Sequence, residues 1–389
     1  MPFAPLQGAR VLDLTSSLAG PYCTQLLAAL GADVIKVERP GAGDEARAWG
    51  PPFFPGGSVM FFAANAGKRS LALDLKAPPG RDVLLRLADG ADVLVQSLRP
   101  GSAERLGLGP EELRARNERL VYCTIGAFGR AGPLRAAPGY DPLMQAFAGI
   151  VSLTGEEGGP GVRAGASLVD IGTGMMAALA VVAALRDGRG RTLDLSLYET
   201  ALALLPYQLT DVLAGGAPPG RQGTAFPLIV PYQAFATSDG ELMIAAANDR
   251  LFASLCEAIG LPELSTDPRF ATNPLRVERR DELIPPLARR LAEEGSATWL
   301  ERLEAAGVPA APVQDLAQVA AHAQTRALGI VQELGGRETI APPLSLDGER
   351  VLHRSPPPLL GEHSGEVLAE AGYSSAEIDA LAAAGIVGL

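Results

Sequence analysis

The first 125 residues alternate short apolar segments with helix-forming segments, and this rhythm constrains the fold more than any other feature of the chain. Strands are predicted over residues 10–14, 33–37, 70–75, 92–96 and 120–125, with helices over 21–30, 80–88 and 110–117. Strands that alternate with helices in this way pair in parallel, because each helix carries the chain back to the same edge of the sheet. The pattern predicts an α/β fold with a mostly parallel, helix-covered sheet.

The rest of the chain predicts a second, smaller domain. A strand over 166–171, a helix over 173–186 and a strand over 192–197 continue the large domain, which we place at 1–214. Glycine and proline accumulate over 215–231 and predict a linker. A hairpin around Ser238-Asp239-Gly240 and helices over 250–259, 281–293 and 298–306 predict a small α+β domain over 232–325. Residues 326–389 then form a proline-rich crossing and a helix over 374–384 with Ser375 as its N-cap.

Composition excludes several classes of partner. The chain has 33 basic and 44 acidic residues and a net charge of −11, which gives no general attraction to nucleic acid or anionic lipid. Its three cysteines, Cys23, Cys123 and Cys256, form no CxxC pair. Residues 1–14 lack the basic and apolar stretches of a signal peptide, so we expect none. Two apolar uncharged runs, 171–185 and 222–238, are shorter than the roughly 20 residues of a membrane helix. We expect a cytoplasmic protein.

Histidine and metal chemistry find little support. His322, His353 and His363 lie near the end of the chain without the spacing of metal ligands or of a catalytic triad. The HExxH, GxSxG and Walker A motifs are absent from the sequence. We therefore predict no metal site, and the chemistry must rest on carboxylates, a tyrosine, backbone groups or a cofactor.

The segment from Ala166 to Leu179 carries the strongest candidate, Asp170. We expect an apolar strand to end at Asp170 and a helix to begin near Thr173, which would place an ionised carboxylate beside a helix N-terminus. Gly172 and Gly174 leave room for a flat acyl group, so Asp170 has the setting of a carboxylate nucleophile.

Two other interpretations of this segment stay open. Asp170 can simply cap the helix. Residues 172–177 also match GxGxxA, with Asp194 placed 22 residues after Gly172, close to a dinucleotide-binding fingerprint. A carboxylate directly before that turn would, however, face the anionic pyrophosphate.

The basic residues suggest a phosphate-bearing ligand. The three lysines, Lys36, Lys68 and Lys76, all lie within 41 residues of one another, and the other basic residues are arginines. Several cations follow predicted strands or lie in the next loop: Arg39, Lys68, Arg69, Lys76, Arg99 and Arg105. Each alone is typical of a solvated surface, but the set favours a polyanionic ligand.

Nine segments together resemble the class III (CaiB/BaiF-type) CoA-transferases, a family that also includes α-methylacyl-CoA racemase. They are LQGARVLDLTSSLAGP (6–21), LGADVIKVERPGAGDEAR (30–47), NAGKRSLALDLK (65–76), ADVLVQSLRPGSAERLGL (91–108), PGYDPLMQAFAGIVSLTG (138–155), GASLVDIGTGMMAAL (165–179), GRTLDLSLYET (190–200), PYQAFATSDGELMIAAANDRLF (231–252) and LLGEHSGEVLAEAGYS (359–374). The resemblance implies CoA thioesters as substrates, no permanently bound cofactor, and an interlocked homodimer of ring-shaped subunits. It implies a Rossmann-like large domain built from both chain ends.

The resemblance also assigns roles to residues. The nucleophile falls on Asp170, and the CoA contacts fall on Ala19, Arg39, Leu73, Asp74, Lys76, Ser97, Leu98, Arg99, Arg105 and Tyr140. Tyr140-Asp141 stands where the racemase branch has a proton-transferring histidine, which disfavours racemisation. Leu18 replaces a glutamine and Ser97 an asparagine of the formyl-CoA branch, and that branch's run of glycines is absent, so oxalate and formate are not expected as substrates.

We therefore expect a CoA-transferase that moves CoA from an acyl-CoA, with succinyl-CoA as the first donor to test, to an acceptor carboxylic acid through an aspartyl mixed anhydride. Three alternatives stay open: an acyl-CoA epimerase of the same family, a nicotinamide-dependent oxidoreductase, and a non-catalytic acyl-CoA-binding protein.

Overall fold

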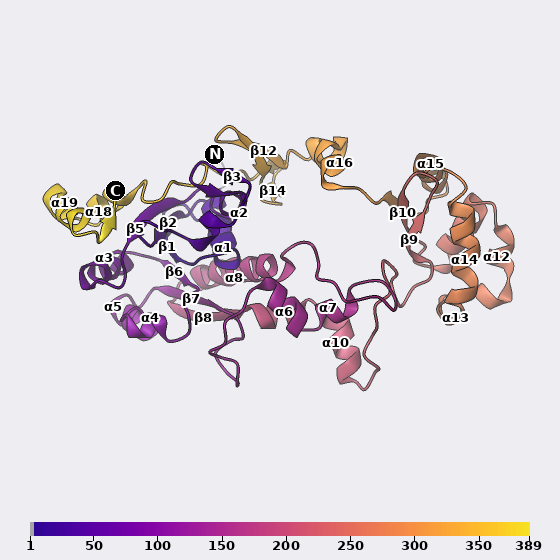
Figure 1. The fold of residues 1–389 in the computed structure, drawn as a ribbon, viewed down its shortest axis with the longest axis horizontal. Helices are drawn as coiled ribbons and strands as arrows, with labels where there is room; N and C mark the ends of the chain where they lie inside the picture. Colours follow the sequence, from indigo (N-terminus) through magenta and orange to yellow (C-terminus); the bar gives the residue numbers. More distant parts are fainter. Residues whose placement is uncertain (1–3) are drawn as a thin grey trace. The chain divides into compact units, whose positions relative to one another are not determined.

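A seven-stranded sheet in the order β16-β5-β2-β1-β6-β7-β8 forms the centre of the larger part of the molecule (Figure 1). Six strands run parallel and only the terminal β16 is antiparallel to its neighbour. The strands are β1 (Arg10–Leu14), β2 (Asp33–Glu38), β5 (Arg69–Leu73), β6 (Val93–Gln96), β7 (Val121–Gly126), β8 (Arg191–Ser196) and β16 (Val387–Gly388). The predicted α/β class with a mostly parallel sheet is confirmed.

One face of this sheet is entirely apolar near its middle. Alternate residues such as Leu12, Ile35 and Leu71 are fully buried in a single cluster, as the two-residue period of a strand requires. The cluster extends into α3 (Pro78–Asp89), α5 (Pro110–Arg116), α18 (Ser364–Glu370) and α19 (Ser375–Ala383). The two C-terminal helices therefore complete the layer that α3 and α5 begin.

The opposite face is covered by α1 (Ala19–Ala29) and α8 (Leu168–Asp187), which pack against each other and against the sheet (Figure 1). By length and composition alone α8 would be apolar enough to cross a membrane, and its packing on α1, β7 and β8 instead makes it the core helix of this layer. Toward the carboxyl ends of β1 and β2 this face turns polar, with Asp13, Lys36 and Glu38 all buried.

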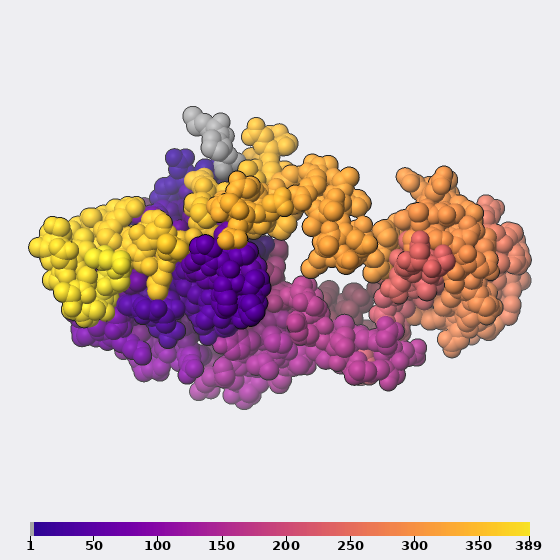
Figure 2. Space-filling model, turned by 45° about the horizontal axis from the view of Figure 1, so that its top comes forward, coloured from indigo at the N-terminus to yellow at the C-terminus, as the bar shows by residue number. Residues whose placement is uncertain are grey.

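Two compact units make up the part of the chain that the computed structural model describes, residues 4–389. Unit 1 comprises the chain up to Ile150, Arg163–Ala217 and Gln324–Leu389, and unit 2 comprises Val151–Val162 and Pro218–Ala323. Within unit 1 the C-terminal segment, yellow in Figure 2, lies against the indigo N-terminal part, and β16 pairs there with β5. Both ends of the chain thus build the same unit.

Smaller elements complete unit 1. They are η1 (Glu45–Ala48), β3 (Phe53–Phe54), β4 (Gly57–Ser58), α2 (Val59–Ala64), α4 (Ser102–Arg105), α6 (Asp141–Phe147), α9 (Leu197–Ala203), α10 (Pro206–Leu213), β12 (Val331–Leu334), β13 (Arg337–Ile340), β14 (Ser345–Leu346) and β15 (Glu349–Arg350). Two short helices, α7 (Ile150–Leu153) and α17 (Ala323–Ala327), span the junctions between the units.

Unit 2 has its own core. A three-stranded antiparallel sheet, β9 (Tyr232–Ala236), β10 (Glu241–Ala245) and β11 (Ala310–Pro312), includes the predicted hairpin. The other elements are α11 (Asp249–Ala258), α12 (Pro262–Thr266), η2 (Pro268–Phe270), α13 (Asn273–Glu278), α14 (Arg280–Leu291), α15 (Ser296–Ala305) and α16 (Leu316–Ala321). Trp299 and Phe252 are buried at its centre, so this unit closes a hydrophobic core without unit 1.

Two local predictions were wrong. Residues 166–171 do not form a strand, because α8 already begins at Leu168 and includes Asp170 in its first turn. The last helix is capped by Ser374 instead of Ser375: the Ser374 hydroxyl accepts from the Glu377 amide, and the Glu377 carboxylate accepts from the Ser374 amide. This reciprocal capping box satisfies two groups that Ser375 would leave unpaired.

Candidate active site

The strand order reverses between β1 and β6, and the loops that leave these two strands meet there. The Ser16 amide, in the loop after β1, donates to the Ser97 hydroxyl, directly after β6, at 3.1 Å. In open parallel sheets ligands bind outside the carboxyl ends of the strands at such a switch point. The topology therefore predicts a ligand site at this edge.

A cavity of about 340 Å³ lies at this edge. Its walls combine the loop after β1 with η1, α2, α6 and the first turn of α8: Ser17, Leu18, Trp49, Met60, Tyr140, Asp141, Pro142, Leu143, Ser167 and Asp170. All of these residues belong to unit 1. The cavity brings together three residues that were predicted from the sequence, Leu18, Tyr140 and Asp170.

The surroundings of Asp170 raise the pKa of its carboxyl group. Its side chain is largely buried, with 8% of the residue exposed, and burial together with the negative charge of Asp141 raises its pKa from 3.8 to about 7. Burial and the neighbouring carboxylate thus oppose the ionised form that a position at a helix N-terminus was expected to favour. Near neutral pH Asp170 exists in both protonation states.

Asp141 was missed as a member of this site and explains where α8 begins. Its Oδ2 accepts hydrogen bonds from the amides of Val169 and Asp170, at 2.8 and 3.2 Å. These amides lie in the first turn of α8, whose cap residue Ser167 makes no side-chain capping bond. Asp141 thus caps the helix from another element and holds Asp170 through its backbone. In the sequence the Asp141-Pro142 pair marks only the start of α6.

Gly174 brings α8 close to the start of α1. A Cβ at this position would lie 2.6 Å from the Ala19 carbonyl oxygen and 3.2 Å from the Cys23 nitrogen. The glycine is therefore required by helix packing. Because residues 172–177 lie inside α8, they form no turn between a strand and a helix, and the dinucleotide-binding interpretation was wrong.

Aromatic side chains form another wall of the cavity. Tyr140 is 46% exposed, packs edge-on against Trp49 with ring centroids 6.2 Å apart, and its hydroxyl donates to the Glu45 carboxylate at 3.3 Å. Burial and the negative charge of Glu45 raise the pKa of Tyr140, so it remains a hydroxyl donor at neutral pH. Trp49 was not predicted as a site residue, because its position on the cavity wall depends on how the η1 segment folds.

The positions expected to contact CoA follow several strands at the same sheet edge. Arg39 comes after β2, Asp74 and Lys76 after β5, and Leu98 and Arg99 after β6. Arg39, Lys76 and Arg99 are exposed. Within residues 4–389 none of these three cations has an ion pair with a carboxylate.

The remaining expected contacts differ in exposure. Arg105 ends α4 at the surface and donates to the Ser102 hydroxyl at 2.7 Å, whereas Ala19 and Leu73 are buried in α1 and β5. A buried Leu73 can offer a ligand little beyond its backbone.

Two of the cations predicted to bind a ligand form ion pairs within the protein instead. Lys68 is 2% exposed and pairs with Asp13 at 3.0 Å, and burial lowers its pKa to about 8 against the opposing effect of Asp13. Arg69 binds Asp33, Glu366 and Glu370. The carboxylates of the fold therefore engage both cations, and neither is free to hold a phosphate. In the described part of the chain no group of three or more His, Cys, Asp or Glu side chains could hold a metal.

Fold and site together define an α/β protein with a Rossmann-like sheet, a largely buried carboxylate on the wall of a cavity, and exposed cations along the same sheet edge. The model of CoA-transferase family III matches residues 6–364, and the chain belongs to this family. The predicted enzyme class, a CoA-transferase, is thereby confirmed.

Curated relatives that cover nearly the whole chain are also CoA-transferases. The chain is 40% identical to the succinyl-CoA:glutarate CoA-transferase of Mus musculus, over 98% of this chain and 90% of that protein. It is 38% identical to the succinate–glutarate CoA-transferase of Agrobacterium fabrum, over 94% and 95%. A solved CAIB/BAIF family protein from Brucella suis has 38% identity and a TM-score of 0.85, covering 94% of this chain and 99% of that one.

Proposed function

We propose that the protein transfers CoA from succinyl-CoA to a carboxylic acid acceptor and that Asp170 is its nucleophile. The observation that carries the proposal is the position of Asp170: a largely buried carboxylate at the first turn of α8, on the wall of the cavity at the switch point. The relatives from mouse and Agrobacterium fabrum support succinyl-CoA as donor and a dicarboxylic acid such as glutarate as acceptor.

Each step conserves atoms and thioester energy. An Asp170 oxygen attacks the thioester carbonyl carbon, the C–S bond breaks, and an acyl-aspartyl anhydride and CoA thiolate form. The thiolate then attacks the aspartyl carbon, releasing succinate and leaving an aspartyl thioester. The acceptor carboxylate displaces the thiolate to form a second anhydride, and attack of the thiolate on the acceptor's carbon yields the new acyl-CoA and regenerates Asp170. Water must be kept out, because hydrolysis of any intermediate wastes the thioester.

The cations at the sheet edge are proposed to bind the phosphates of CoA. Arg39, Lys76, Arg99 and Arg105 are exposed there, and guanidinium groups suit phosphate oxygens. Ala19, Leu73, Asp74, Ser97, Leu98 and Tyr140 complete the proposed CoA site. CoA enters as part of the substrate.

Trapping of the intermediate tests the nucleophile. The protein is incubated with succinyl-CoA, acetyl-CoA or glutaryl-CoA, hydroxylamine is added, and the intact mass and peptides are measured. We expect a hydroxamate at Asp170 and none in Asp170→Asn. Folded Asp170→Ala protein with wild-type turnover, or an adduct at another residue, would overturn the assignment. Oxalate belongs among the acceptors tested, since an acetyl-CoA:oxalate CoA-transferase of Acetobacter aceti is 38% identical.

We further propose that the protein acts as a homodimer in the cytoplasm. Leu143 and Phe147 of α6, and Met175, Met176 and Leu179 of α8, are 42–61% exposed on two helices that pack together, and an apolar surface of this kind is typical of an interface. The three cysteines are free and buried, as suits a reducing compartment. Light scattering after gel filtration should show a dimer, and Met176→Glu should shift it toward monomer.

A further inference from the structure

The loop after β1 is held by side chains from three different segments. The amide of Thr15 donates to Asp13 Oδ1 at 2.9 Å, that of Ser16 to the Ser97 hydroxyl, and that of Ser17 to Asp44 Oδ1 at 3.1 Å. Ser17 has a φ of 71°, in the left-handed region that residues other than glycine rarely adopt. A non-glycine residue stays in this conformation only where its surroundings fix it.

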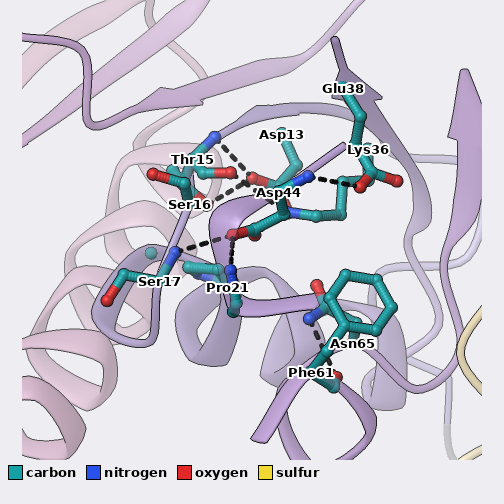
Figure 3. Close-up of polar contacts among 12 residues, drawn as sticks. Asp13, Thr15, Ser16, Ser17, Pro21, Lys36, Glu38, Asp44, Phe61 and Asn65 are labelled. Carbon is teal, nitrogen blue, oxygen red and sulfur yellow. Dashed lines mark hydrogen bonds and ion pairs between the residues drawn. The ribbon is translucent and has the colours of Figure 1, made fainter. Parts of the chain in front are cut away.

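A buried ion pair lies beneath this loop (Figure 3). Lys36 Nζ is 2.8 Å from Asp44 Oδ2, and the two side chains are 0% and 1% exposed. Lys36 Nζ also donates to the Thr15 carbonyl at 2.9 Å. The cation therefore holds one end of the loop while the carboxylate holds Ser17. The negative charges of Asp13 and Glu38 also act on Lys36, so the pair belongs to a larger buried charge network.

The same carboxylate fixes a second wall of the cavity. Asp44 Oδ1 accepts from the Ala46 amide at 2.9 Å and caps η1, which leads directly to Trp49. Ser17 and Leu18 on one side and Trp49 on another line the cavity that contains Asp170. One buried ion pair is thus bonded to two of the segments that line the cavity with Asp170.

We propose that Lys36 and Asp44 are positioning residues: their ion pair sets the conformation of residues 15–18 and of η1, and thereby the shape of the Asp170 cavity in which the acyl group reacts. The inference rests on the proposed function for its catalytic consequence, but the positioning itself is a property of the fold. Neither residue lines the cavity, so neither touches the reacting atoms.

Two variants separate positioning from stability. Lys36→Met/Asp44→Leu replaces the ion pair with apolar groups, a change that often leaves stability unaltered or improved, while removing both bonds to the loop. Asp44→Asn keeps an acceptor for the Ser17 amide but removes the charge. Asp33→Asn is the matched control, because Asp33 pairs with Arg10 and Arg69 at the opposite end of the same strand, β2.

The measurements are succinyl-CoA-dependent turnover, thermal unfolding and hydrogen exchange of peptides covering residues 14–18. In the double variant we expect faster exchange in this segment and a fall in kcat of roughly 100-fold, as for misplacement of catalytic groups by about 1 Å, with a much smaller change in the KM for acyl-CoA. Asp44→Asn should fall between the double variant and wild type, and the control should match wild type in exchange and kcat.

Wild-type exchange and wild-type kcat in a folded double variant would overturn the proposal. If the double variant does not fold, Asp44→Asn decides by the same two criteria. If the wild-type protein transfers no CoA, the proposed function fails, whereas the exchange comparison between the variants still tests the positioning.

Discussion

Asp170 must lose its proton before it can attack a thioester, so its pKa sets the pH dependence of the reaction. Burial and the charge of Asp141 raise that pKa to about 7. We therefore expect kcat/KM to rise with pH along a limb with an apparent pKa near 7, since this ratio reports the free enzyme. Initial rates between pH 5.5 and 9 with saturating acceptor check this. A flat profile from pH 5.5 upward would show that Asp170 titrates at its ordinary value.

Removal of the neighbouring charge should move that limb. Asp141→Asn abolishes the repulsion and is expected to shift the limb to lower pH, although burial keeps the pKa of Asp170 above 3.8. The maximal rate should also fall, because an amide caps α8 less well than a carboxylate. Glu45→Gln is the control, since Glu45 contacts Tyr140 and does not contribute to the pKa of Asp170. A shift of equal size in both variants would refute the pairing.

The same pKa affects stability. The folded protein binds the Asp170 proton more tightly than the unfolded chain does, so protonation of Asp170 stabilises the fold. This stabilisation is fully present below pH 3.8 and is lost as pH rises through about 7. Asp170→Asn cannot ionise, so above pH 7 it should be more stable than wild type by up to about 4 kcal/mol. Urea unfolding at pH 5.5 and pH 8 measures this, and the gain should shrink at the lower pH. An equal effect at both values would contradict it.

Individual residues differ in how far sequence could place them. Asp170 was found because a lone carboxylate between an apolar run and a glycine pair is an uncommon pattern. Its partner Asp141 lies 29 positions earlier, and no local pattern shows which distant side chain caps a helix. Lys68 and Arg69 were predicted as ligand cations because sequence does not show the Asp13 and Asp33 carboxylates that occupy them.

At the scale of elements, the contact between α1 and α8 decides where Asp170 lies. Gly174→Ala would place a Cβ 2.6 Å from the Ala19 carbonyl oxygen, so one helix must move. We expect a loss of roughly 1–3 kcal/mol in the free energy of unfolding, together with reduced kcat. Gly90→Ala, where the added Cβ meets nothing within 4 Å, should change neither quantity. Unchanged stability in Gly174→Ala would mean that the helices can separate freely.

The strands of the sheet were predictable because their apolar residues recur with a period of two between helices, and β1 matches its predicted range of 10–14. The start of α8 was not predictable in the same way. Its first turn reads as an apolar run that a strand and a helix fit equally, and tertiary capping by Asp141 resolves the ambiguity. The predicted N-cap of the last helix was wrong for a related reason, since the adjacent residues Ser374 and Ser375 are equally good caps by sequence.

At the scale of the whole molecule, the segregation of apolar residues into separate cores predicts independent behaviour. The clusters around Leu12 and around Trp299 share no residue, so the two units are expected to lose structure in separate steps. The glycine and proline residues over 215–231 indicated part of this division, because unit 2 begins again at Pro218. No sequence pattern indicated that residues 151–162 belong to unit 2. Their place depends on contacts with residues more than 60 positions away, such as the hydrogen bond from the Gly223 amide to the Gly155 carbonyl.

The two tryptophans report on the two units separately. Trp49 is 39% exposed on the wall of the cavity in unit 1, whereas Trp299 is fully buried in the core of unit 2. In Trp49→Phe protein, emission therefore comes from Trp299 alone and should shift to longer wavelength when unit 2 unfolds. We expect the urea midpoint of this transition to differ from the midpoint measured by far-ultraviolet circular dichroism, to which both units contribute.

Addition of succinyl-CoA should change the fluorescence of Trp299→Phe protein, in which Trp49 remains, and leave that of Trp49→Phe unchanged. Coincident unfolding transitions would show that the units fold as one, and a response to succinyl-CoA confined to Trp299 would move the acyl site away from the cavity.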